Sequence, residues 1–247
     1  MKFVVTAGPT REHLDPVRFL SNPSTGKMGF AVARAAATRG HEVALVTGPV
    51  SLRTPRGVRR IDVTSAREML AAVERELSQQ AGPSISPERS EPRQRSIEGC
   101  EAAQAPGTVF IATAAVADWR PAKCAAKKLK KGQMSNTLRL VRNPDILKTV
   151  ARRTKHQAPA RIAHASTIFV GFAAETNDVL AEARRKCREK NLDMIVANDV
   201  TEKGSGFGVD TNRVTLVGKD GSVERLPLMT KLAVARRIVR VCEDLCP

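Results

Sequence analysis

The sequence predicts an α/β protein with a Rossmann-like, doubly wound and mostly parallel sheet, helices on both faces and a small antiparallel hairpin near the C-terminus. Short apolar, β-branched runs alternate with stretches of helical periodicity, which is the pattern of parallel strands joined by crossover helices. Near the C-terminus, two strand-like runs are separated by Asp220-Gly221, a dipeptide typical of hairpin turns.

The first strand and the first helix have clear signals. Residues 2–6 form a short apolar run that ends in turn-forming residues, as expected of a buried strand. A helix is expected over 25–39, because Ser24 or Thr25 can cap its start and Gly40 can end it.

Two further strands and a second helix follow. Apolar runs at 42–47 and 59–63 predict strands, and Ser65 and Glu68 have the spacing of a capping box that opens a helix. Another strand is expected to begin at residue 109.

Residues 78–107 interrupt this alternation. They are rich in proline, serine and alternating charges, a composition that cannot bury a core. Because a strand-like run resumes directly at 109, we expect a disordered surface insertion within a single nucleotide-binding domain that spans residues 1–247.

The remaining elements follow the same rules, with apolar runs as strands and amphipathic stretches as helices. Strands are expected at 137–141, 167–175, 194–199, 213–218 and 222–228, and helices from Asn143 onward, over 177–190 and over 229–243.

Composition limits the possible functions. The chain has 41 Lys and Arg against 25 Asp and Glu, a formal net charge of +16, which by itself favours nucleic acid as a partner. Aromatic residues make up only 3%, however, so stacking platforms for single strands are scarce, and no duplex-docking motif is present. A nucleic-acid partner is therefore not expected, and the charge fits pockets for anionic small molecules better.

The chain is expected to be cytoplasmic. No apolar run approaches the length of about 18 residues that a membrane span needs. The apolar N-terminal run is too short for a signal peptide. The odd number of scattered cysteines, without a CxxC pair, is typical of reduced thiols.

Four segments place small or charged residues at predicted strand ends, where doubly wound sheets bind nucleotides. They are residues 6–29, residues 112–132, the strand end at Gly171 and Phe172 with its following helix, and the strand at 194–199 with the glycine-rich loop after it. An ordinary turn, a solvated lysine-rich loop and a plain surface helix remain open as alternatives for these segments.

Neither common phosphate-binding motif is present in the first segment. A P-loop needs Gly and Ser or Thr where this chain has Ser21 and Met28, and the dinucleotide fingerprint is reduced to Gly-Lys-Met-Gly. Gly26 and Gly29 still permit close backbone approach, and Lys27 adds a positive charge.

Several long motifs, in this order, closely resemble the phosphopantothenate–cysteine ligase family (phosphopantothenoylcysteine synthetases). They are TAGPTREHLDPVRFLSNPSTGKMG, AAVADWRP with a following KKLKK, NPDIL, VGFAAET and IVANDV. The resemblance covers nearly the whole chain apart from about 78–108, and it begins at the first strand of the ligase. It therefore implies a stand-alone ligase without the flavin-dependent decarboxylase half, and no FMN.

The resemblance implies amide-bond formation in coenzyme A biosynthesis. The carboxylate of 4′-phosphopantothenate attacks CTP and expels pyrophosphate, and L-cysteine opens the resulting acyl-cytidylate with release of CMP. The resemblance also implies that the enzyme uses Mg²⁺ and forms a homodimer, but it does not identify residues that bind the metal. The Gly-Lys-Met-Gly run is similar to the bacterial, CTP-dependent type rather than the eukaryotic type, which prefers ATP.

Residue roles follow from the resemblance. Asn22 stabilises or orients the intermediate, Arg18 holds the phosphopantothenate side or the dimer loop, and Lys128 acts from a flexible flap. Asp118 contacts the ribose. The CTP-binding positions are Ala112, Thr113, Ala114, Asp118, Lys128, Asn143, Pro144, Asp145, Ile146, Phe172, Lys186 and Lys190.

The sequence departs modestly from the family's pattern. Trp119 stands where an aromatic residue is common, Lys127 stands where an acidic residue is frequent, and the 78–108 insertion is unusual. An NAD(P)-dependent oxidoreductase of the same fold class is the main alternative, but the second strand ends in VTGP without the acidic residue that such enzymes use. A basic nucleic-acid-binding protein is the other alternative.

Overall fold

The computed structural model describes residues 1–79, 107–130, 137–157, 167–175, 178–199, 201–202, 204–206 and 208–246. The insertion expected at 78–107 lies outside the described residues, apart from positions 78, 79 and 107. In the described part of the chain, every helix is too short or too polar to cross a membrane.

The centre of the protein is an eight-stranded sheet with the order β13-β12-β10-β9-β6-β1-β4-β5. The six strands β5, β4, β1, β6, β9 and β10 run parallel to one another. At the other edge, β12 pairs antiparallel with β10, and β13 pairs antiparallel with β12. The strands are β1 (Lys2–Ala7), β4 (Glu42–Thr47), β5 (Arg59–Asp62), β6 (Thr108–Ala112), β9 (Thr167–Glu175), β10 (Met194–Asp199), β12 (Val214–Gly218) and β13 (Val223–Arg225). This architecture confirms the predicted fold class.

The direction of chain progression across the sheet reverses between β1 and β6. The chain moves from β1 to β4 and β5 on one side, and then returns to β6, β9 and β10 on the other. Such a reversal is a topological switch point, and ligands bind there at the carboxyl ends of the strands.

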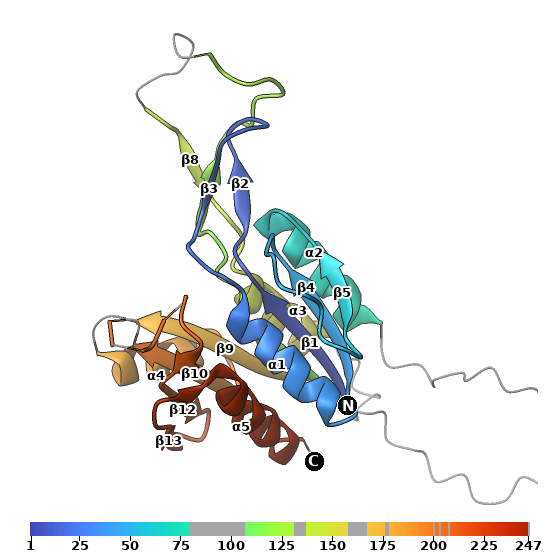
Figure 1. Ribbon diagram of the computed structural model, residues 1–247, viewed down its shortest axis with the longest axis vertical. Helices are drawn as coiled ribbons and strands as arrows, with labels where there is room; N and C mark the ends of the chain where they lie inside the picture. Colours follow the sequence, from blue (N-terminus) through green and yellow to red (C-terminus); the bar gives the residue numbers. More distant parts are fainter. Residues whose placement is uncertain are drawn as a thin grey trace, which may run out of the picture.

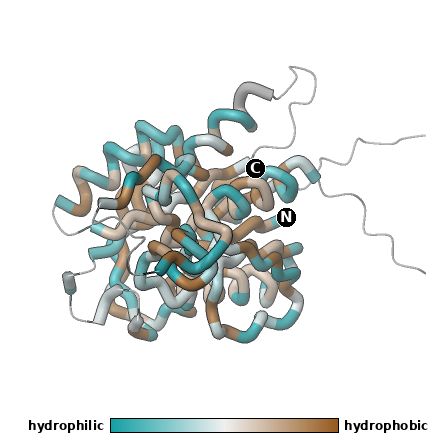
Figure 2. Tube along the Cα trace, turned by 90° about the horizontal axis from the view of Figure 1, so that it is seen from above, coloured by the Kyte–Doolittle hydropathy of each residue, from teal (hydrophilic) through white to brown (hydrophobic). Residues whose placement is uncertain are grey.

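Helices cover both faces of the sheet (Figure 1). α1 (Lys27–Thr38) and α5 (Lys231–Asp244) pack on one face, and α2 (Ala66–Ser78), α3 (Ile146–Gln157) and α4 (Val179–Glu189) pack on the other. Phe3 and Val5 of β1 belong to the first core and Val4 to the second, as strand alternation requires. Figure 2 shows hydrophobic (brown) and hydrophilic (teal) stretches following one another along the helical turns of the trace, as in helices with one apolar face.

Two short hairpins project from this body as an arm (Figure 1). β2 (Arg11–His13) pairs with β3 (Phe19–Ser21), and β7 (Trp119–Pro121) pairs with β8 (Leu140–Arg142). The hairpins touch one another through β2 and β7. The arm was not predicted: residues 11–21 are a hairpin rather than part of a simple turn, and β8 begins later than the strand expected at 137.

A final two-stranded ladder joins β11 (Thr211–Asn212) to β14 (Met229–Thr230). The strand β11 directly follows a segment that we call the glycine-rich loop, defined as residues 204–206 and 208–210. The predicted hairpin turn at Asp220-Gly221 is confirmed, because Gly221 has the positive φ of 91° that such a turn needs.

The helices α1 and α3 begin slightly later than predicted, and α2 begins as predicted. α1 begins at Lys27 after Gly26, which has a φ of 77° and provides no side-chain cap, so neither Ser24 nor Thr25 caps it. α3 begins at Ile146 rather than Asn143. α2 begins as predicted, because the Ser65 hydroxyl accepts a hydrogen bond from the Glu68 amide.

Candidate functional site

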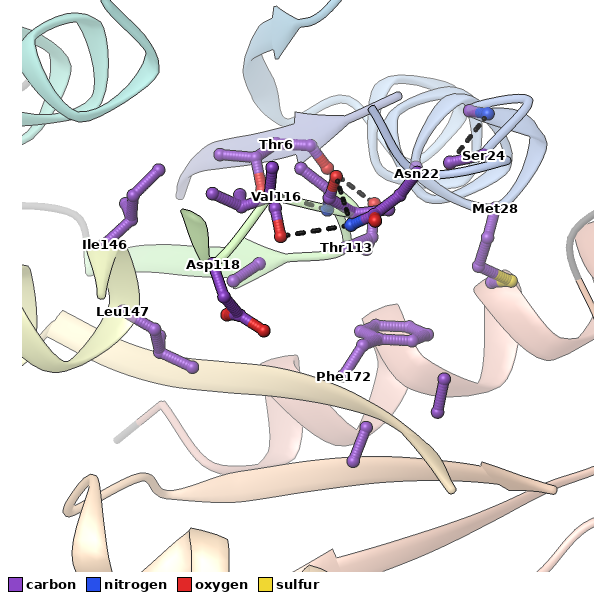
Figure 3. A pocket seen from close by; sticks show the side chains of 18 of the residues that line it. Thr6, Asn22, Ser24, Met28, Thr113, Val116, Asp118, Ile146, Leu147 and Phe172 are labelled. Carbon is purple, nitrogen blue, oxygen red and sulfur yellow. Dashed lines mark hydrogen bonds between the residues drawn. The ribbon is translucent and has the colours of Figure 1, made fainter. Parts of the chain in front are cut away.

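A cavity of about 750 Å³ opens at the switch point (Figure 3). Thr6 at the end of β1, the segment after β6, Phe172 of β9 and Asn198 of β10 line it. The first residues of α1, α3 and α5 complete its walls. The cavity therefore lies where a doubly wound sheet binds its ligand.

Most of the residues that the sequence singled out meet in this cavity, although they come from distant parts of the chain. The lining includes Asn22, Ala112, Thr113, Ala114, Asp118, Asn143, Pro144, Asp145, Ile146, Phe172, Lys186 and Lys190. Arg18 and Lys128 do not line it.

Asn22 lies in the connection between β3 and α1. Its Nδ2 donates to the carbonyl oxygens of Ala115 and Val116, at 3.3 and 3.2 Å (Figure 3). These contacts hold the carboxamide across the switch point, between the segments that follow β1 and β6. The side chain remains exposed to the cavity, where it can meet a ligand.

Asn143, directly after β8, fixes the cavity wall at the base of the arm. Its Nδ2 donates to the Ala117 carbonyl at 2.7 Å, its Oδ1 accepts from Arg120 at 3.0 Å, and its backbone amide donates to the Asp118 carbonyl at 2.7 Å. These bonds direct the Asp118 side chain into the cavity (Figure 3). Asn143 therefore precedes α3 rather than beginning it, and its backbone amide is not free.

The start of α3 is instead occupied by a carboxylate. Asp145 Oδ1 accepts from the backbone amide of Lys148 at 3.0 Å, as an N-cap residue does. Its other oxygen pairs with Lys190 at 2.8 Å. This helix start already carries a negative group, so a substrate phosphate is not expected to bind there.

Two cavity lysines, one in the last turn of α4 and one directly after it, are both paired. Lys186 contacts Glu175 at 2.5 Å, and Lys190 contacts Asp145. The charges at this end of the cavity are therefore largely balanced within the protein. Such an end suits hydrogen bonding to a polar, uncharged ring better than binding of a multiply charged phosphate.

The start of α1 has the opposite character. No side chain caps this helix, so its first N–H groups are available to an anion in the cavity. Gly29 lets the helix approach the strands, since a Cβ there would lie 2.4 Å from Thr113 Oγ1 and 2.5 Å from Ala7 Cβ. Lys27 adds a positive charge beside this helix start.

Three further residues that were not individually predicted also line the cavity: Asn198, Asn212 and Lys231. Ser205 Oγ lies 2.7 Å from Asn198 Oδ1 and 2.6 Å from Asn212 Oδ1. The motif IVANDV and the following glycines were a usable signal for the two asparagines. Lys231 had no such signal, because a lysine at the start of an amphipathic helix is ordinarily exposed.

Arg18 belongs to a clamp within the arm. Its guanidinium pairs with Asp15 at 2.5 Å and donates to the Leu129 carbonyl at 2.9 Å, while the Leu129 amide donates to Asp15 at 3.2 Å. The hydrogen bonds from Arg18 hold the pKa of the buried Asp15 carboxyl well below its usual range. The clamp places the exposed Lys128 next to the turn of the first hairpin.

The described residues contain no cluster of three or more His, Cys, Asp or Glu side chains that could hold a metal ion by themselves. Asp118 and Asp145 are the carboxylates that line the cavity. This donor set fits Mg²⁺ brought in by a nucleotide, since Mg²⁺ is commonly held by one or two carboxylates together with substrate phosphates.

The fold and the cavity define a class: doubly wound α/β domains with a polar ligand cleft at the switch point of the sheet. Within this class, residues 1–82 and 94–245 match the family described as the DNA/pantothenate metabolism flavoprotein C-terminal domain. The chain belongs to this family.

Curated relatives show the same relationship. The chain is 43% identical over 245 residues to the coenzyme A biosynthesis bifunctional protein CoaBC of Vibrio cholerae, which covers 98% of this chain and 52% of that protein. It is 44% identical to CoaBC of Bacillus subtilis, covering 96% of this chain and 50% of that protein. The chain thus spans about half the length of these relatives.

A solved structure has the same fold along almost the whole chain. It is the crystal structure of the C-terminal domain of coenzyme A biosynthesis bifunctional protein CoaBC, with a TM-score of 0.71 and 39% sequence identity. The match covers 99% of this chain and 96% of that one.

Proposed function

We propose that this chain is a phosphopantothenate–cysteine ligase that uses CTP and acts in coenzyme A biosynthesis. The observation that carries the proposal is the convergence of the family's motif residues, from separate segments, on the cavity at the switch point. The names of the relatives, which refer to coenzyme A biosynthesis, support the same assignment.

The reaction has two balanced steps. The carboxylate of 4′-phosphopantothenate attacks the α-phosphorus of CTP, forming an acyl-cytidylate and releasing pyrophosphate. The amine of L-cysteine then attacks the acyl carbon, so the amide bond forms, the amine loses a proton and CMP leaves. Both steps build negative charge on oxygens, which fixed hydrogen-bond donors and cations can stabilise.

Different parts of the cavity suit the triphosphate, the base and the ribose of CTP. We assign the triphosphate to the uncapped start of α1, where amide N–H groups are available and where Lys27, whose partner Asp210 is exposed to solvent, lies nearby. The paired Lys186 and Lys190, with Phe172, are assigned to the nucleoside. Asp118, which points into the cavity, is assigned to the ribose (Figure 3).

Asn22 lies between these parts and is assigned to the acyl group. Its carboxamide is anchored on two backbone carbonyls, so its orientation is fixed before the substrate arrives. A polar group fixed in this way interacts with the acyl group at little reorganisation cost. Lys128, outside the cavity in this structure, is assigned to a flap that closes over the acyl-cytidylate.

Mg²⁺ is proposed to enter with CTP, held chiefly by the phosphate oxygens of the nucleotide. When bound, it neutralises phosphate charge and so favours attack on the α-phosphorus.

We also propose that the enzyme is a homodimer that joins through the arm. Apolar side chains are exposed there to an unusual degree: Val17, Phe19, Trp119, Leu138 and Leu140 are each between 39% and 57% exposed. A neighbouring set of exposed apolar side chains on a projecting element is typical of a protein–protein interface. Arg18, on the same arm, would then lie at or near this interface.

A pyrophosphate-release assay tests the ligase proposal. Incubation with 4′-phosphopantothenate, L-cysteine, Mg²⁺ and CTP is expected to release pyrophosphate and CMP in equal amounts and to form the cysteine amide. ATP is expected to support a much lower rate. Without cysteine, release is expected to stop after about one turnover per site. The proposal is wrong if neither nucleotide supports amide formation.

A further inference from the structure

Lys231 occupies a position that helix stability does not explain. It is the first residue of α5, where the positive end of the helix dipole disfavours a cation. Only 5% of its surface is exposed, and removing an ammonium group from water is costly unless hydrogen bonds replace the lost solvent. Burial and the nearby Lys27 lower the pKa of Lys231.

The ammonium group of Lys231 holds the glycine-rich loop. Its Nζ donates to the carbonyl oxygens of Gly206 at 2.8 Å and Val209 at 2.6 Å. Its backbone amide donates to the Asp210 carbonyl at 2.9 Å. One residue therefore contacts the loop at three positions, Gly206, Val209 and Asp210.

Lys27 holds the same loop from the solvent side. Its Nζ donates to the Gly208 carbonyl at 3.0 Å and pairs with Asp210 at 2.7 Å. This contact is weaker than that of Lys231, because Lys27 is one-third exposed and the Asp210 side chain is 86% exposed. Lys231 is thus the buried anchor of the loop, and Lys27 an exposed one.

The loop needs an anchor because its glycines allow the backbone to adopt many conformations. Gly204 and Gly206 have φ values of 85° and 120°, a region that glycine enters readily but holds only when other contacts fix it. Gly206 of the loop and Asn212 of β11, which follows the loop, line the cavity together with the start of α1. The conformation of the loop consequently determines the shape of the cavity where we place the triphosphate.

We infer that Lys231 is a positioning residue for nucleotide binding: its buried ammonium fixes the glycine-rich loop in the conformation that forms the cavity wall beside α1. This inference rests on the proposed function for the identity of the nucleotide, but the anchoring of the loop does not depend on it.

Hydrogen exchange of the ligand-free protein, read over peptides within residues 204–213, tests the anchoring directly. Lys231→Met keeps the length of the side chain and removes the donors, so exchange in this loop is expected to be faster than in the wild type. Lys231→Arg keeps a cation and its donors, and is expected to restore most of the protection. Lys148→Met removes an exposed lysine of α3 and serves as the matched control.

Calorimetric titration with CTP and steady-state kinetics test the consequence. Lys231→Met is expected to raise the dissociation constant and KM for CTP at least about tenfold, while kcat falls less than about threefold, because the residue touches the loop rather than the reacting atoms. A merely structural role would lower the thermal midpoint and the active fraction without changing KM.

The outcomes separate the two proposals. Unchanged loop exchange and unchanged CTP affinity in folded Lys231→Met would overturn the inference. If this variant does not fold, Lys231→Gln replaces it, and wild-type protection of its loop overturns the inference equally. A wild-type protein without ligase activity would instead overturn the proposed function, and the exchange measurement would still decide the role of Lys231 in the loop.

Discussion

Asn22 illustrates how one side chain can serve both the fold and the chemistry. Its Nδ2 bonds the segment after β6, so the amide is rigid where the acyl group is proposed to bind. Asn22→Asp removes the donors and adds a charge near carbonyl oxygens and substrate phosphates. We expect kcat to fall by a factor on the order of 10²–10³, the scale for loss of one oxyanion donor, with a smaller change in KM.

Pre-steady-state kinetics of Asn22→Asp, combined with CTP titration, would measure both effects. The thermal midpoint of the variant serves as the control for loss of fold. Turnover at the wild-type rate would remove Asn22 from the reaction, whereas loss of CTP binding alone would reassign it to the nucleotide.

Lys128 and Lys127 form a matched pair for testing the flap. Both are exposed, so the fold gives no reason for them to differ. Lys128→Gln is expected to slow attack by cysteine and to let the acyl-cytidylate accumulate, because the flap loses the cation that holds it over the intermediate. Lys127→Gln is expected to behave like the wild type, since a solvated lysine contributes little.

Mass spectrometry of the quenched reaction would detect the accumulated acyl-cytidylate. Equal behaviour of the two variants would mean that the lysine-rich segment acts only as a diffuse positive field, without a specific role for Lys128.

At the scale of elements, α2 is held to the sheet by an ion-pair cluster in which Glu76 and Lys2 are buried and Arg59 is half exposed. Glu76 of α2 pairs with Lys2 of β1 at 3.4 Å and with Arg59 of β5 at 2.5 Å. The hydrogen bonds from Arg59 and the charge of Lys2 lower the pKa of Glu76 below its ordinary value of 4.5. This carboxylate therefore stabilises the folded state at neutral pH, and its contribution is lost as the pH falls from 4.5 toward the lower folded-state pKa.

Glu76→Gln is expected to lower the free energy of unfolding by about 3 kcal/mol at pH 7, because it leaves the buried ammonium of Lys2 without its counter-charge. Urea unfolding at several pH values would show the difference from the wild type shrinking below pH 4.5. Glu74→Gln, which removes a more exposed carboxylate from the same helix, is expected to cost much less. A difference that grows in acid would contradict this account.

The elements of the sheet could be predicted because their signals are local. β1, β4, β9 and β10 are apolar runs, and Ser65 marks the start of α2. The arm could not be predicted in this way, because β2 and β3 have only three residues each, and their one buried side chain, Glu12, is charged rather than apolar. Their partners become apparent only once the hairpins are placed in space.

The candidate site shows the same division. Asn22, Asp118 and Phe172 were found through long motifs, and the structure brings them to one cavity. The bonded state of Asn143 and the buried anchor at Lys231 depend on contacts with distant carbonyl groups. Such contacts leave no pattern of spacing in the sequence, and therefore only the fold reveals them.

At the scale of the whole molecule, the proposed dimer depends on the arm. Val17→Glu and Leu140→Glu, made together, place charges on two exposed apolar positions of its two hairpins. Light scattering is expected to show half the wild-type mass, because a desolvated and unpaired charge disfavours association. Val223→Glu, on an exposed position of the edge strand β13, serves as the control and should leave the mass unchanged.

The contradictory result would be a dimer that survives the double substitution, or a wild-type protein that is monomeric at micromolar concentration. Either would leave the exposed apolar residues of the arm without a role in self-association.

The arm is also built from parts that are remote in sequence: Arg18 and Leu129, joined in its clamp, are 111 positions apart. It shares neither of the two hydrophobic cores, so its stability comes from a few hydrogen bonds and ion pairs rather than from buried apolar surface. Cooperative units with few buried contacts open at lower free energy than the rest of a protein.

On warming, the arm should therefore melt before the sheet. The fluorescence of the single tryptophan, Trp119 at the root of the arm, should change at a lower temperature than the far-ultraviolet circular dichroism. Heat would then abolish subunit association and flap closure while the α/β body still retains its fold.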